Sequence, residues 1–400
     1  MVYKYKAIKE NGDTVKGFFE TESEEEVLLM LKSKNYMPVS IEKDIEKSSS
    51  IEIFKEKVKK KDLAVFTRQF FTMVDAGISI VRCLEILSVQ TENKTLKKAL
   101  GEMHLDLQKG ITLSGAMNKY PKFFPPILIN MVEAGEVSGN LDTILERMAV
   151  HFEKENKLEN KIKSAFIYPV ILIIVSLAVV VFMLVGVLPT FVEMFESSGT
   201  ELPGITIFLL NASDLLQEYW YIFIALIGGV ILLFTYYRST ESGKRIFDAL
   251  KINLPVFKGV NSKVITSRFT RTLSTLMSSG IPLLEALRVV GNVVNNSVVK
   301  IRLQEGMEGI ERGVPLSQAI KDVEVFPPMV YSMVNIGEES GSLDEILVKT
   351  ADFYDEEVEV ALENMTTLIE PILLVSMAVV IGFIVIAMAL PMFDLVNTIN

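Results

Sequence analysis

Carboxylates at matching positions in two stretches of the sequence are the first residues whose chemistry needs an explanation. Glu136 lies in the pattern G-E-V-S-G, and Glu338 lies in the later pattern G-E-E-S-G. One interpretation is structural, with each carboxylate making either a hydrogen bond at a helix terminus or a salt bridge to a repeated arginine, Arg68 or Arg271. The other interpretation is functional, with each carboxylate contacting a partner protein.

A second group of carboxylates follows in the second half of the chain. Crowded carboxylates can hold a hard cation between two subunits, because calcium and magnesium prefer oxygen ligands. The same spacing is also typical of a solvated helix face. The acidic residues of this group are Asp355, Glu356, Glu357 and Glu359, and the first half has Glu153, Lys154, Glu155 and Lys157 at the matching places.

Patterns for catalysis and cofactor binding are absent from the sequence. It contains no G-x-x-x-x-G-K-[ST] phosphate loop, no G-x-S-x-G and no H-E-x-x-H. His104 and His151 fall on predicted soluble helices, and we interpret them as surface or structural residues. Cys83 is the only cysteine, which excludes an internal disulfide and a multi-cysteine zinc site. We interpret it as a small buried apolar residue. We expect no enzyme activity, no cofactor and no metal.

Composition and charge favour a membrane protein over a nucleic-acid-binding protein. The 400 residues carry a formal net charge of −10 and half of them are apolar, with a mean hydropathy of +0.36. This net charge disfavours direct binding of nucleic acid. Three runs, at residues 170–188, 219–237 and 371–393, contain no charged side chain, and each is long enough to span a bilayer as a helix. Ion-coupled transporters usually place charged groups in such runs.

The chain is organised as a duplication. Residues 130–145 and 332–347 are identical at ten of sixteen positions, aligned without a gap. Equivalent residues upstream of this stretch, such as Gly77 and Gly280, are 203 residues apart in the two copies. The second copy then lacks one residue, so later equivalents, such as Pro169 and Pro371, are 202 residues apart. Each copy ends in an apolar run, so the last helix of each copy is expected to enter the membrane.

Helical periodicity predicts an all-α bundle of about six helices in each copy. An apolar face that includes Leu63, Phe66 and Phe70 predicts the first helix, and further helices of the first copy are expected at residues 79–89, 96–108, 113–118 and 126–134. Gly77 is expected to end the first of them, because helices often stop at a residue with positive φ.

The signature stretch and the entry to the membrane run also carry local predictions. Gly135 and Gly139 are expected to permit a tight corner, after which Asn140 caps the next helix. Ser342, the counterpart of Asn140, is expected to form a capping box with Glu345. A proline at the start of each apolar run predicts a kink or a helix start there.

The fold class expected is mainly α: an integral membrane protein with two homologous cytoplasmic helical bundles, three transmembrane helices and a small N-terminal α+β domain. Near the N-terminus, Tyr3, Tyr5 and Ala7 alternate with lysines as in a half-buried strand, residues 14–20 and 38–41 fit further strands, and residues 27–34 fit a helix. The predicted divisions are an N-terminal domain at 1–45, a linker at 46–61, the first bundle at 62–168, spans at 169–188, 218–237 and 370–391, an external loop at 189–217, the second bundle at 238–369 and an external tail at 392–400.

Basic residues flank the predicted spans unevenly. Lys157, Lys161 and Lys163 precede the first span, Lys244 and other basic residues follow the second, and residues 189–217 contain no Lys or Arg. The positive-inside rule therefore places the N-terminus and both bundles in the cytoplasm. Residues 352–370, before the third span, are acidic and contain no Lys or Arg, so they depart from this rule. Because two spans return the chain to the cytoplasm, the third span still places the C-terminal tail outside.

Four motifs together resemble the F family of type II secretion systems, which includes the inner-membrane platform proteins of secretion machines and of type IV pili. They are F-T-R-Q at residues 66–69, A-G-I at 76–78, and G-E-x-S-G-x-L-D at 135–142 and 337–344. The resemblance covers residues 60–398, and the opening Y-x-Y-x-A is similar to the small N-terminal domain of these proteins. The motif and structural residues are Arg68, Gly77, Gly135, Glu136, Gly139, Asp142, Pro169, Arg271, Gly280, Gly337, Glu338, Gly341, Asp344 and Pro371.

The resemblance implies a non-enzymatic role in the cytoplasmic, or inner, membrane. Members of the family are thought to couple a cytoplasmic assembly or secretion ATPase to pilin or pseudopilin subunits. The expected partners are that ATPase, pilins or pseudopilins, other inner-membrane assembly proteins, the lipid bilayer and further copies of the chain. Two other classes stay open: a membrane transporter built from parallel repeats, and a passive membrane anchor of a cytoplasmic complex.

Overall fold

The computed structural model describes residues 2–8, 14–21, 24–33, 36–43, 56–196 and 203–398. The chain forms two compact units, Met1–Lys57 and Val58–Asn400. Most of the predicted linker, residues 46–55, lies outside the described residues, and the four residues 56–59 have no regular secondary structure.

The described residues of the N-terminal unit form a three-stranded antiparallel sheet and one helix. Its elements are β1 (Val2–Ile8), β2 (Thr14–Glu20), α1 (Glu24–Ser33) and β3 (Met37–Lys43), and the strand order is β2-β1-β3. The alternation in β1 has the predicted effect, because Tyr3 and Ala7 are buried on one face against Val27 and Leu31 of α1. The small α+β fold expected from the sequence is therefore confirmed.

The first copy of the duplication is a bundle of six helices, as predicted. They are α3 (Lys60–Asp75), α4 (Ile80–Gln90), α5 (Lys94–Gln108), α6 (Leu113–Asn118), α7 (Pro126–Ser138) and α8 (Leu141–Phe182). The predicted apolar face of α3 is buried, with Phe66 and Phe70 at its centre. Gly77 has a φ of +79° and follows the end of α3, where a residue with a Cβ would be strained.

The second copy repeats these helices in the same order. They are α13 (Pro255–Met277), α14 (Leu283–Val293), α15 (Ser297–Glu311), α16 (Leu316–Asp322), α17 (Pro328–Ser340) and α18 (Leu343–Thr398), preceded by α12 (Glu241–Asn253). From α4 to α6 each helix begins 203 residues before its counterpart, and α7 and α8 begin 202 residues before theirs. The missing residue therefore lies in the connection between α16 and α17.

The two bundles share one apolar core instead of forming two separate ones. A continuous cluster of buried side chains runs from Leu63 in the first copy to Tyr354 in the second. Each copy centres this core on an equivalent aromatic pair: the ring centroids of Phe66 and Phe124 are 5.8 Å apart, and those of Phe269 and Phe326 are 4.6 Å apart. The helices α8, α13 and α18 contact one another and join the copies.

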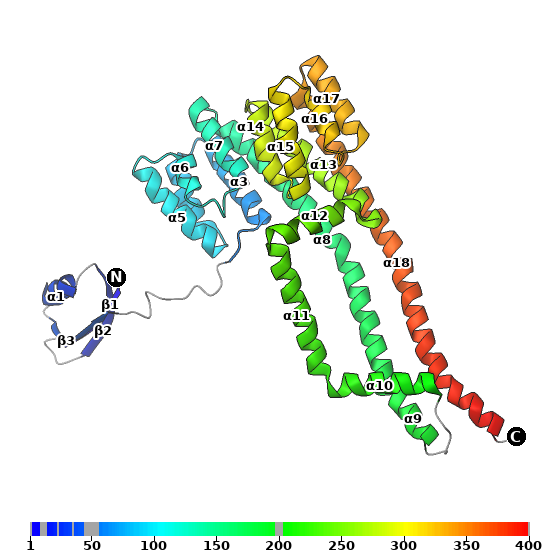
Figure 1. Cartoon of the computed structure of the whole chain (residues 1–400). Coiled ribbons are helices and arrows are strands. Elements are labelled where there is room, and N and C mark those ends of the chain that lie inside the picture. The colour runs from blue at the N-terminus through cyan, green and yellow to red at the C-terminus, as the bar shows by residue number, and fades with distance from the viewer. Residues whose placement is uncertain are drawn as a thin grey trace. The chain divides into compact units, whose positions relative to one another are not determined.

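Among the described residues, three helices are long and apolar enough to cross a membrane: α8 with its continuation, α11 (Trp220–Ser239) and α18. In Figure 1 all three extend away from the bundles in the same general direction. Helix α8 passes through Pro169 without interruption, and α18 passes through Pro371, so the helix start considered at these prolines is wrong. A proline is tolerated inside a long membrane helix where neighbouring groups compensate for the missing hydrogen bond.

The segment predicted as an external loop, residues 189–217, is largely helical. A π-helical turn (Met183–Val187) follows α8, then come α9 (Leu188–Glu196) and α10 (Gly204–Glu218). The Thr206 hydroxyl donates to the Ala387 carbonyl at 2.6 Å, and the Ser213 hydroxyl donates to the Leu184 carbonyl at 2.7 Å. Helix α10 therefore ties the ends of the first and third spans together, as its position across their ends in Figure 1 shows.

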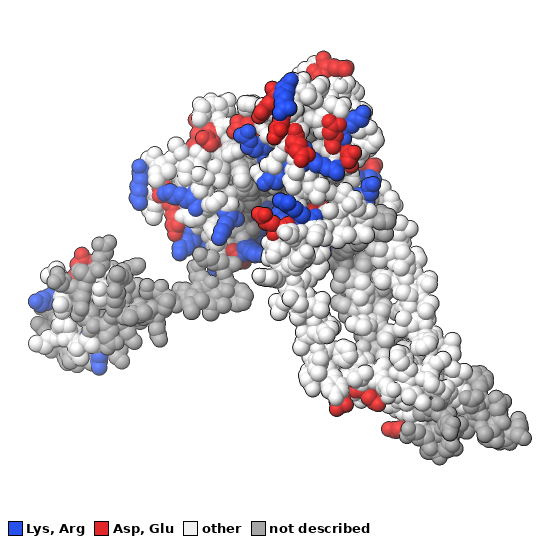
Figure 2. Space-filling model, in the orientation of Figure 1, with Lys and Arg blue, Asp and Glu red and all other residues white. Residues whose placement is uncertain are grey.

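Charge is distributed unevenly along the second unit. On the face shown in Figure 2, Lys and Arg side chains lie among Asp and Glu side chains on the helical bundles, the spans show no charged side chain, and the described residues at their far end show acidic side chains without basic ones. The predicted tail, residues 392–400, continues α18 as a helix up to Thr398.

Candidate functional site

The two repeated glutamates hold the short helices α6 and α16 in place. The Glu136 carboxylate accepts hydrogen bonds from the backbone N–H groups of Leu113 at 2.5 Å and Ser114 at 3.1 Å. Glu338 accepts the equivalent bonds from Leu316 at 2.5 Å and Ser317 at 3.0 Å. The carboxylates therefore satisfy backbone donors at a helix N-terminus that have no partner inside the helix. Of the two structural interpretations, the helix-terminal hydrogen bond is confirmed and the salt bridge to arginine is wrong.

The glycines of the signature stretch have two different roles. Gly139 and Gly341 end α7 and α17 with φ values of +75° and +68°, and they form the predicted corner. Gly135 lies inside α7 instead, where a Cβ would come within 3.0 Å of Ile144 Cγ1. At Gly337 a Cβ would lie 2.9 Å from the Leu343 Cα. These two glycines therefore let the following helix pack closely, whereas Gly139 and Gly341 supply the positive φ of the corner itself.

The predicted caps differ from what the structure shows. Asn140 stands at the N-cap of α8, but its side chain makes no capping hydrogen bond within residues 56–196. The Ser342 hydroxyl pairs with the Ser340 hydroxyl at 2.7 Å, and the Glu345 carboxylate binds Lys349 at 2.7 Å. Both side chains of the expected capping box are therefore engaged with other partners.

The signature corners lie at the end of the bundles that is remote from the membrane spans. Helix α8 begins at Leu141, which is roughly 40 Å from Pro169 at 1.5 Å per residue, and α18 begins at the same distance from Pro371. Figure 1 shows α7 and α17 at this end. Asp142 and Asp344 are exposed in the first turns of α8 and α18. The corners therefore present acidic side chains to solvent, far from the bilayer.

Each repeated arginine pairs with a carboxylate of the long helix of its own copy. Arg68 binds Glu153 with two hydrogen bonds of 2.6 Å, and these hold the pKa of Glu153 below its ordinary value. Arg271 binds Asp355 at 2.6 Å, and Asp355 is the counterpart of Glu153. Arg271 also binds Asp352 at 2.7 Å. The duplication therefore preserves an Arg–carboxylate bridge between the first and last helices of each bundle.

A second ion pair recurs in the same way. Lys60 binds Glu155 at 2.7 Å, and its counterpart Lys263 binds Glu357 at 2.6 Å. The acidic group of the second copy is therefore engaged in ion pairs within the chain, and is more than a solvated face. Among the residues that the structure describes, no group of three or more His, Cys, Asp or Glu side chains is arranged to hold a metal ion.

Other charged residues of α8 and α18 join the two copies to each other. Lys154 binds Asp352 at 3.3 Å, and Lys161 binds Glu359. The counterparts of Lys154 and Lys157 in α18 are acidic, so α8 presents a basic face to an acidic face of α18. A cleft of about 410 Å³ lies between these faces. Opposite charges at equivalent positions thus let two otherwise similar helices attract each other.

A buried polar cluster lies deeper between the copies and was not predicted from the sequence. Glu155 contacts Arg268 of the second copy at 3.6 Å as well as Lys60. Burial raises the pKa of Glu155, but Lys60 and the other nearby cations outweigh it and hold the pKa below its ordinary value. His151 lies one helical turn away with 2% of its surface exposed, and burial lowers its pKa to about 4. These residues line a cavity of about 560 Å³.

The other residues considered in the sequence have structural surroundings. His104 Nδ1 lies 3.0 Å from the Val81 carbonyl oxygen. Cys83 is fully buried in α4, where burial raises the pKa of its thiol, in agreement with the interpretation as a small core residue. The arrangement of the second unit therefore fits a structural scaffold with exposed corners and with apolar helices that are long enough to span a bilayer.

Comparison with known proteins identifies a family along nearly the whole chain. Residues 66–189 and 269–391 each match the family "Type II secretion system (T2SS), protein F". Residues 1–42 match "Type II secretion system protein F, N-terminal domain". The two matches to the first family coincide with the two copies of the duplication.

Curated relatives match over the full length. The chain is 38% identical to the type IV pilus assembly protein PilC of Thermus thermophilus, over 100% of the chain and 99% of the relative. It is 38% identical to PilC of Myxococcus xanthus, over 100% and 96%. It is 34% identical to the type II secretion system protein F of Vibrio cholerae, over 99% and 98%. The chain therefore belongs to the protein F family of type II secretion systems.

Proposed function

We propose that the chain is the inner-membrane platform of a type IV pilus or type II secretion machine, and that it couples a cytoplasmic ATPase to the extraction of pilins or pseudopilins. The names of the full-length relatives, which belong to pilus assembly and to type II secretion, support this role. Three helices that can span a membrane support a multi-pass inner-membrane protein. The sequence lacks a phosphate loop, so a separate motor supplies the energy.

The observation that carries the coupling is the continuity of α8 and α18. Helix α8 has 42 residues and α18 has 56, and each runs from a signature corner at the remote end of the bundles into a membrane span. A force applied at the corner reaches the bilayer through a single hydrogen-bonded helix in each copy. The ion pairs and the shared core between the copies make both helices move as one body.

The exposed corners fit the ATPase side of this proposal. They place Asp142 and Asp344 on the surface remote from the spans, and Val137 beside the first corner is 87% exposed. Exposed acidic residues with an apolar neighbour suit a protein partner that carries basic groups. A cytoplasmic motor can reach this face because the positive-inside rule assigns the bundles to the cytoplasm.

The spans fit the pilin side. Their surface consists of exposed apolar side chains, such as Ile174 and Leu177 in α8 and Leu232 in α11, and the runs at residues 170–188, 219–237 and 371–393 contain no charged residue. An apolar transmembrane helix of a pilin can lie against such a surface without desolvating a charge. We propose that tilting or rotation of the bundles is transmitted through the spans to a pilin helix as it leaves the bilayer.

A stiffness test addresses the coupling directly. Lys163, Ser164 and Ile167 are exposed in α8 between the bundle and Pro169, so they can be replaced without opening the core. Their replacement by three glycines weakens the helix by about 1 kcal/mol per residue relative to three alanines. Both variants lose the same side chains, which makes the alanine variant the matched control.

The two variants are compared with the wild type in a strain that lacks the chain. Surface filaments, secreted protein and DNA uptake are scored side by side, together with the amount of each variant in the membrane and its binding to the ATPase. We expect the alanine variant to restore one output, and the glycine variant to bind the ATPase but leave pilins in the membrane. Full assembly with the glycine variant at equal abundance would contradict the coupling. If deletion changes no output, the platform role itself is wrong, and the transporter or anchor takes its place.

A further inference from the structure

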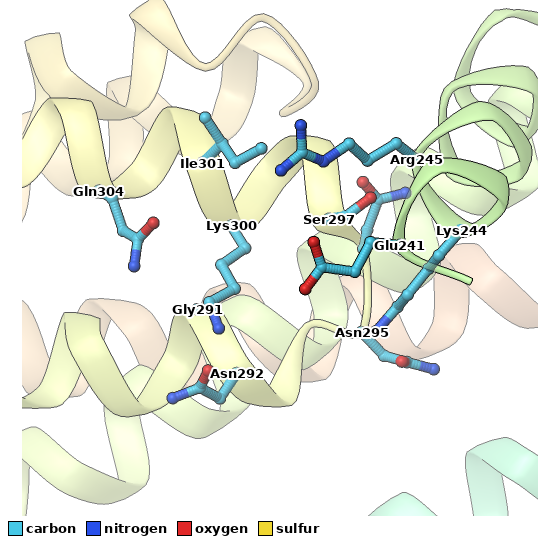
Figure 3. A pocket seen from close by; sticks show the side chains of 11 residues that line it. Glu241, Lys244, Arg245, Gly291, Asn292, Asn295, Ser297, Lys300, Ile301 and Gln304 are labelled. Carbon is cyan, nitrogen blue, oxygen red and sulfur yellow. The ribbon is translucent and has the colours of Figure 1, made fainter. Parts of the chain in front are cut away.

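A basic cavity of about 480 Å³ lies where α12 meets the corner between α14 and α15. Figure 3 shows Lys244 and Arg245 on α12, and Lys300 on α15, around this space. Asn292 near the end of α14 and Asn295 just beyond it add amide groups that can donate hydrogen bonds, although the Asn292 amide already donates one to the Arg288 carbonyl at 3.2 Å.

Basic side chains outnumber acidic ones in this cavity. Among the residues that the structure describes, its lining contains one carboxylate, that of Glu241, and three basic side chains. Within residues 203–398, none of Lys244, Arg245 and Lys300 forms an ion pair with a carboxylate. Three cations that line one cavity, with amides nearby, are a surrounding that suits a phosphate group.

A buried carboxylate fixes the walls of the cavity. Asp248 of α12 is 4% exposed and accepts hydrogen bonds of 3.0 Å from both the backbone N–H and the hydroxyl of Ser297, at the start of α15. Asn296 donates to the Asp248 carbonyl at 3.3 Å. The basic residues of α12 and α15 are therefore held close together before any ligand binds, which lowers the cost of binding.

The position of α12 places the cavity at the level of the lipid headgroups. Helix α12 directly follows the span α11, and Phe247 contacts Phe234 of that span with ring centroids 4.7 Å apart. Along α12, Ile246, Leu250 and Leu254 form an apolar stripe at four-residue spacing, and each is more than 40% exposed. An exposed apolar stripe on a helix with basic residues is typical of a helix lying in the membrane interface. Figure 1 shows α12 at the junction between spans and bundles.

We propose that this cavity binds the phosphate-containing headgroup of an anionic phospholipid, with α12 as the interfacial helix that holds the site at the bilayer surface. Lys244, Arg245 and Lys300 contact the phosphate, and the amides of Asn292 and Asn295 bind polar groups beyond it. The apolar stripe of α12 lies among the acyl chains. The site is independent of any ATPase or pilin.

The test uses the full chain in a zwitterionic detergent and counts bound lipids by native mass spectrometry. Phosphatidylglycerol and phosphatidylcholine are titrated separately onto the wild type and onto the triple variant Lys244→Gln, Arg245→Gln, Lys300→Gln. The control variant carries Lys98→Gln, Lys109→Gln and Lys122→Gln. These three lysines are exposed in the first bundle and carry the same total charge.

Each basic side chain near an anionic lipid contributes about a factor of five in affinity, so we expect the triple variant to bind phosphatidylglycerol about 100-fold more weakly. The control variant should bind it as the wild type does. The proposal is overturned if the triple variant binds phosphatidylglycerol as tightly as the wild type does. It is also overturned if the control variant loses as much affinity as the triple variant. If inorganic phosphate displaces the lipid at similar concentrations, the cavity is a site for a soluble phosphate and the lipid assignment is wrong. Matching thermal unfolding of all three proteins in lipid-free detergent shows that folding is intact.

Discussion

Acidification should destabilise the protein through one buried imidazole. His151 is 2% exposed, its ring lies edge-on to Phe152 with centroids 5.3 Å apart, and neither ring nitrogen has a hydrogen-bond partner among the described residues. Burial lowers the pKa of His151 to about 4 from its ordinary value of 6.5. Glu155 opposes this shift, whereas Lys60 and Arg271 add to it. The folded protein therefore keeps this side chain neutral at a pH at which the unfolded chain protonates it.

The sign and size of the effect follow from these two pKa values. Because the folded pKa is the lower one, the contribution to stability is complete above pH 6.5 and is lost as the pH falls towards 4. Between pH 7.5 and pH 5, the unfolded chain gains nearly one proton that the folded chain does not bind. The free energy of unfolding should therefore fall by about 2 kcal/mol over this range from His151 alone.

The assay is thermal unfolding of the full chain in detergent, measured from pH 7.5 to pH 5 for the wild type and for His151→Leu. Leucine fills a similar space and cannot be protonated, so the variant should gain about 2 kcal/mol over the wild type at pH 5, or roughly 3 °C in Tm, with little difference at pH 7.5. His104→Gln removes the only other histidine and serves as the control, because His104 is only partly buried. If the Tm of the wild type and the Tm of His151→Leu fell by the same amount between pH 7.5 and pH 5, the reasoning would be refuted.

Two further predictions use the duplication as its own control, and both are checked by the Tm of the purified chain. Gly135→Ala and Gly337→Ala should each destabilise the protein by about 1–3 kcal/mol, since the new methyl group meets the next helix, whereas Gly228→Ala in α11, with no atom within 4 Å of the added Cβ, should be neutral or stabilising. An equal effect at all three sites would exclude the close approach as the cause. Arg271→Ala should lower the free energy of unfolding by about 3 kcal/mol, because Arg271 is 11% exposed and Asp355 would lose its cationic partner. Arg68→Ala should lower it by only about 1 kcal/mol, because Arg68 is 37% exposed. The reverse order would show that burial does not decide the strength of these bridges.

The repeat made much of the fold predictable from the sequence. Two copies of one pattern constrain each other, so the helices of the first bundle were predicted close to their observed bounds, and the membrane spans followed from uncharged runs of sufficient length. The N-terminal sheet was predictable because its alternation has the period of a strand. These features depend on local pattern, which the sequence displays directly.

The partners of charged side chains were not predictable in the same way. A salt bridge between Glu136 and Arg68 was one of the two structural interpretations, but Arg68 binds Glu153, 85 residues away. Spacing along the chain does not reveal which helix faces which across a bundle. A usable signal was nevertheless present, because opposite charges that recur at equivalent positions in both copies, such as Lys60 with Glu155 and Lys263 with Glu357, mark pairs that the fold keeps together.

The connection after the first span was missed for another reason. The external loop was predicted because residues 189–217 contain no Lys or Arg, and the apolar residues of α10 were not weighed as a helix. The hydrogen bonds of Thr206 and Ser213 hold α10 against the ends of the spans. They join residues that are far apart in the sequence, so no local pattern predicts them.

The brace formed by α10 has a mechanical consequence. The first and third spans are joined at one end by the shared core and at the other by α10, so they form a closed frame that resists splaying but can lean as a whole. Helix α8, with 42 residues, is roughly 63 Å long at 1.5 Å per residue. A lean of about 5° at its bundle end would carry the opposite end sideways by about 5 Å, close to the rise of one helical turn. In such a frame, a small tilt at the bundles would displace the far ends of the spans by about the rise of one helical turn.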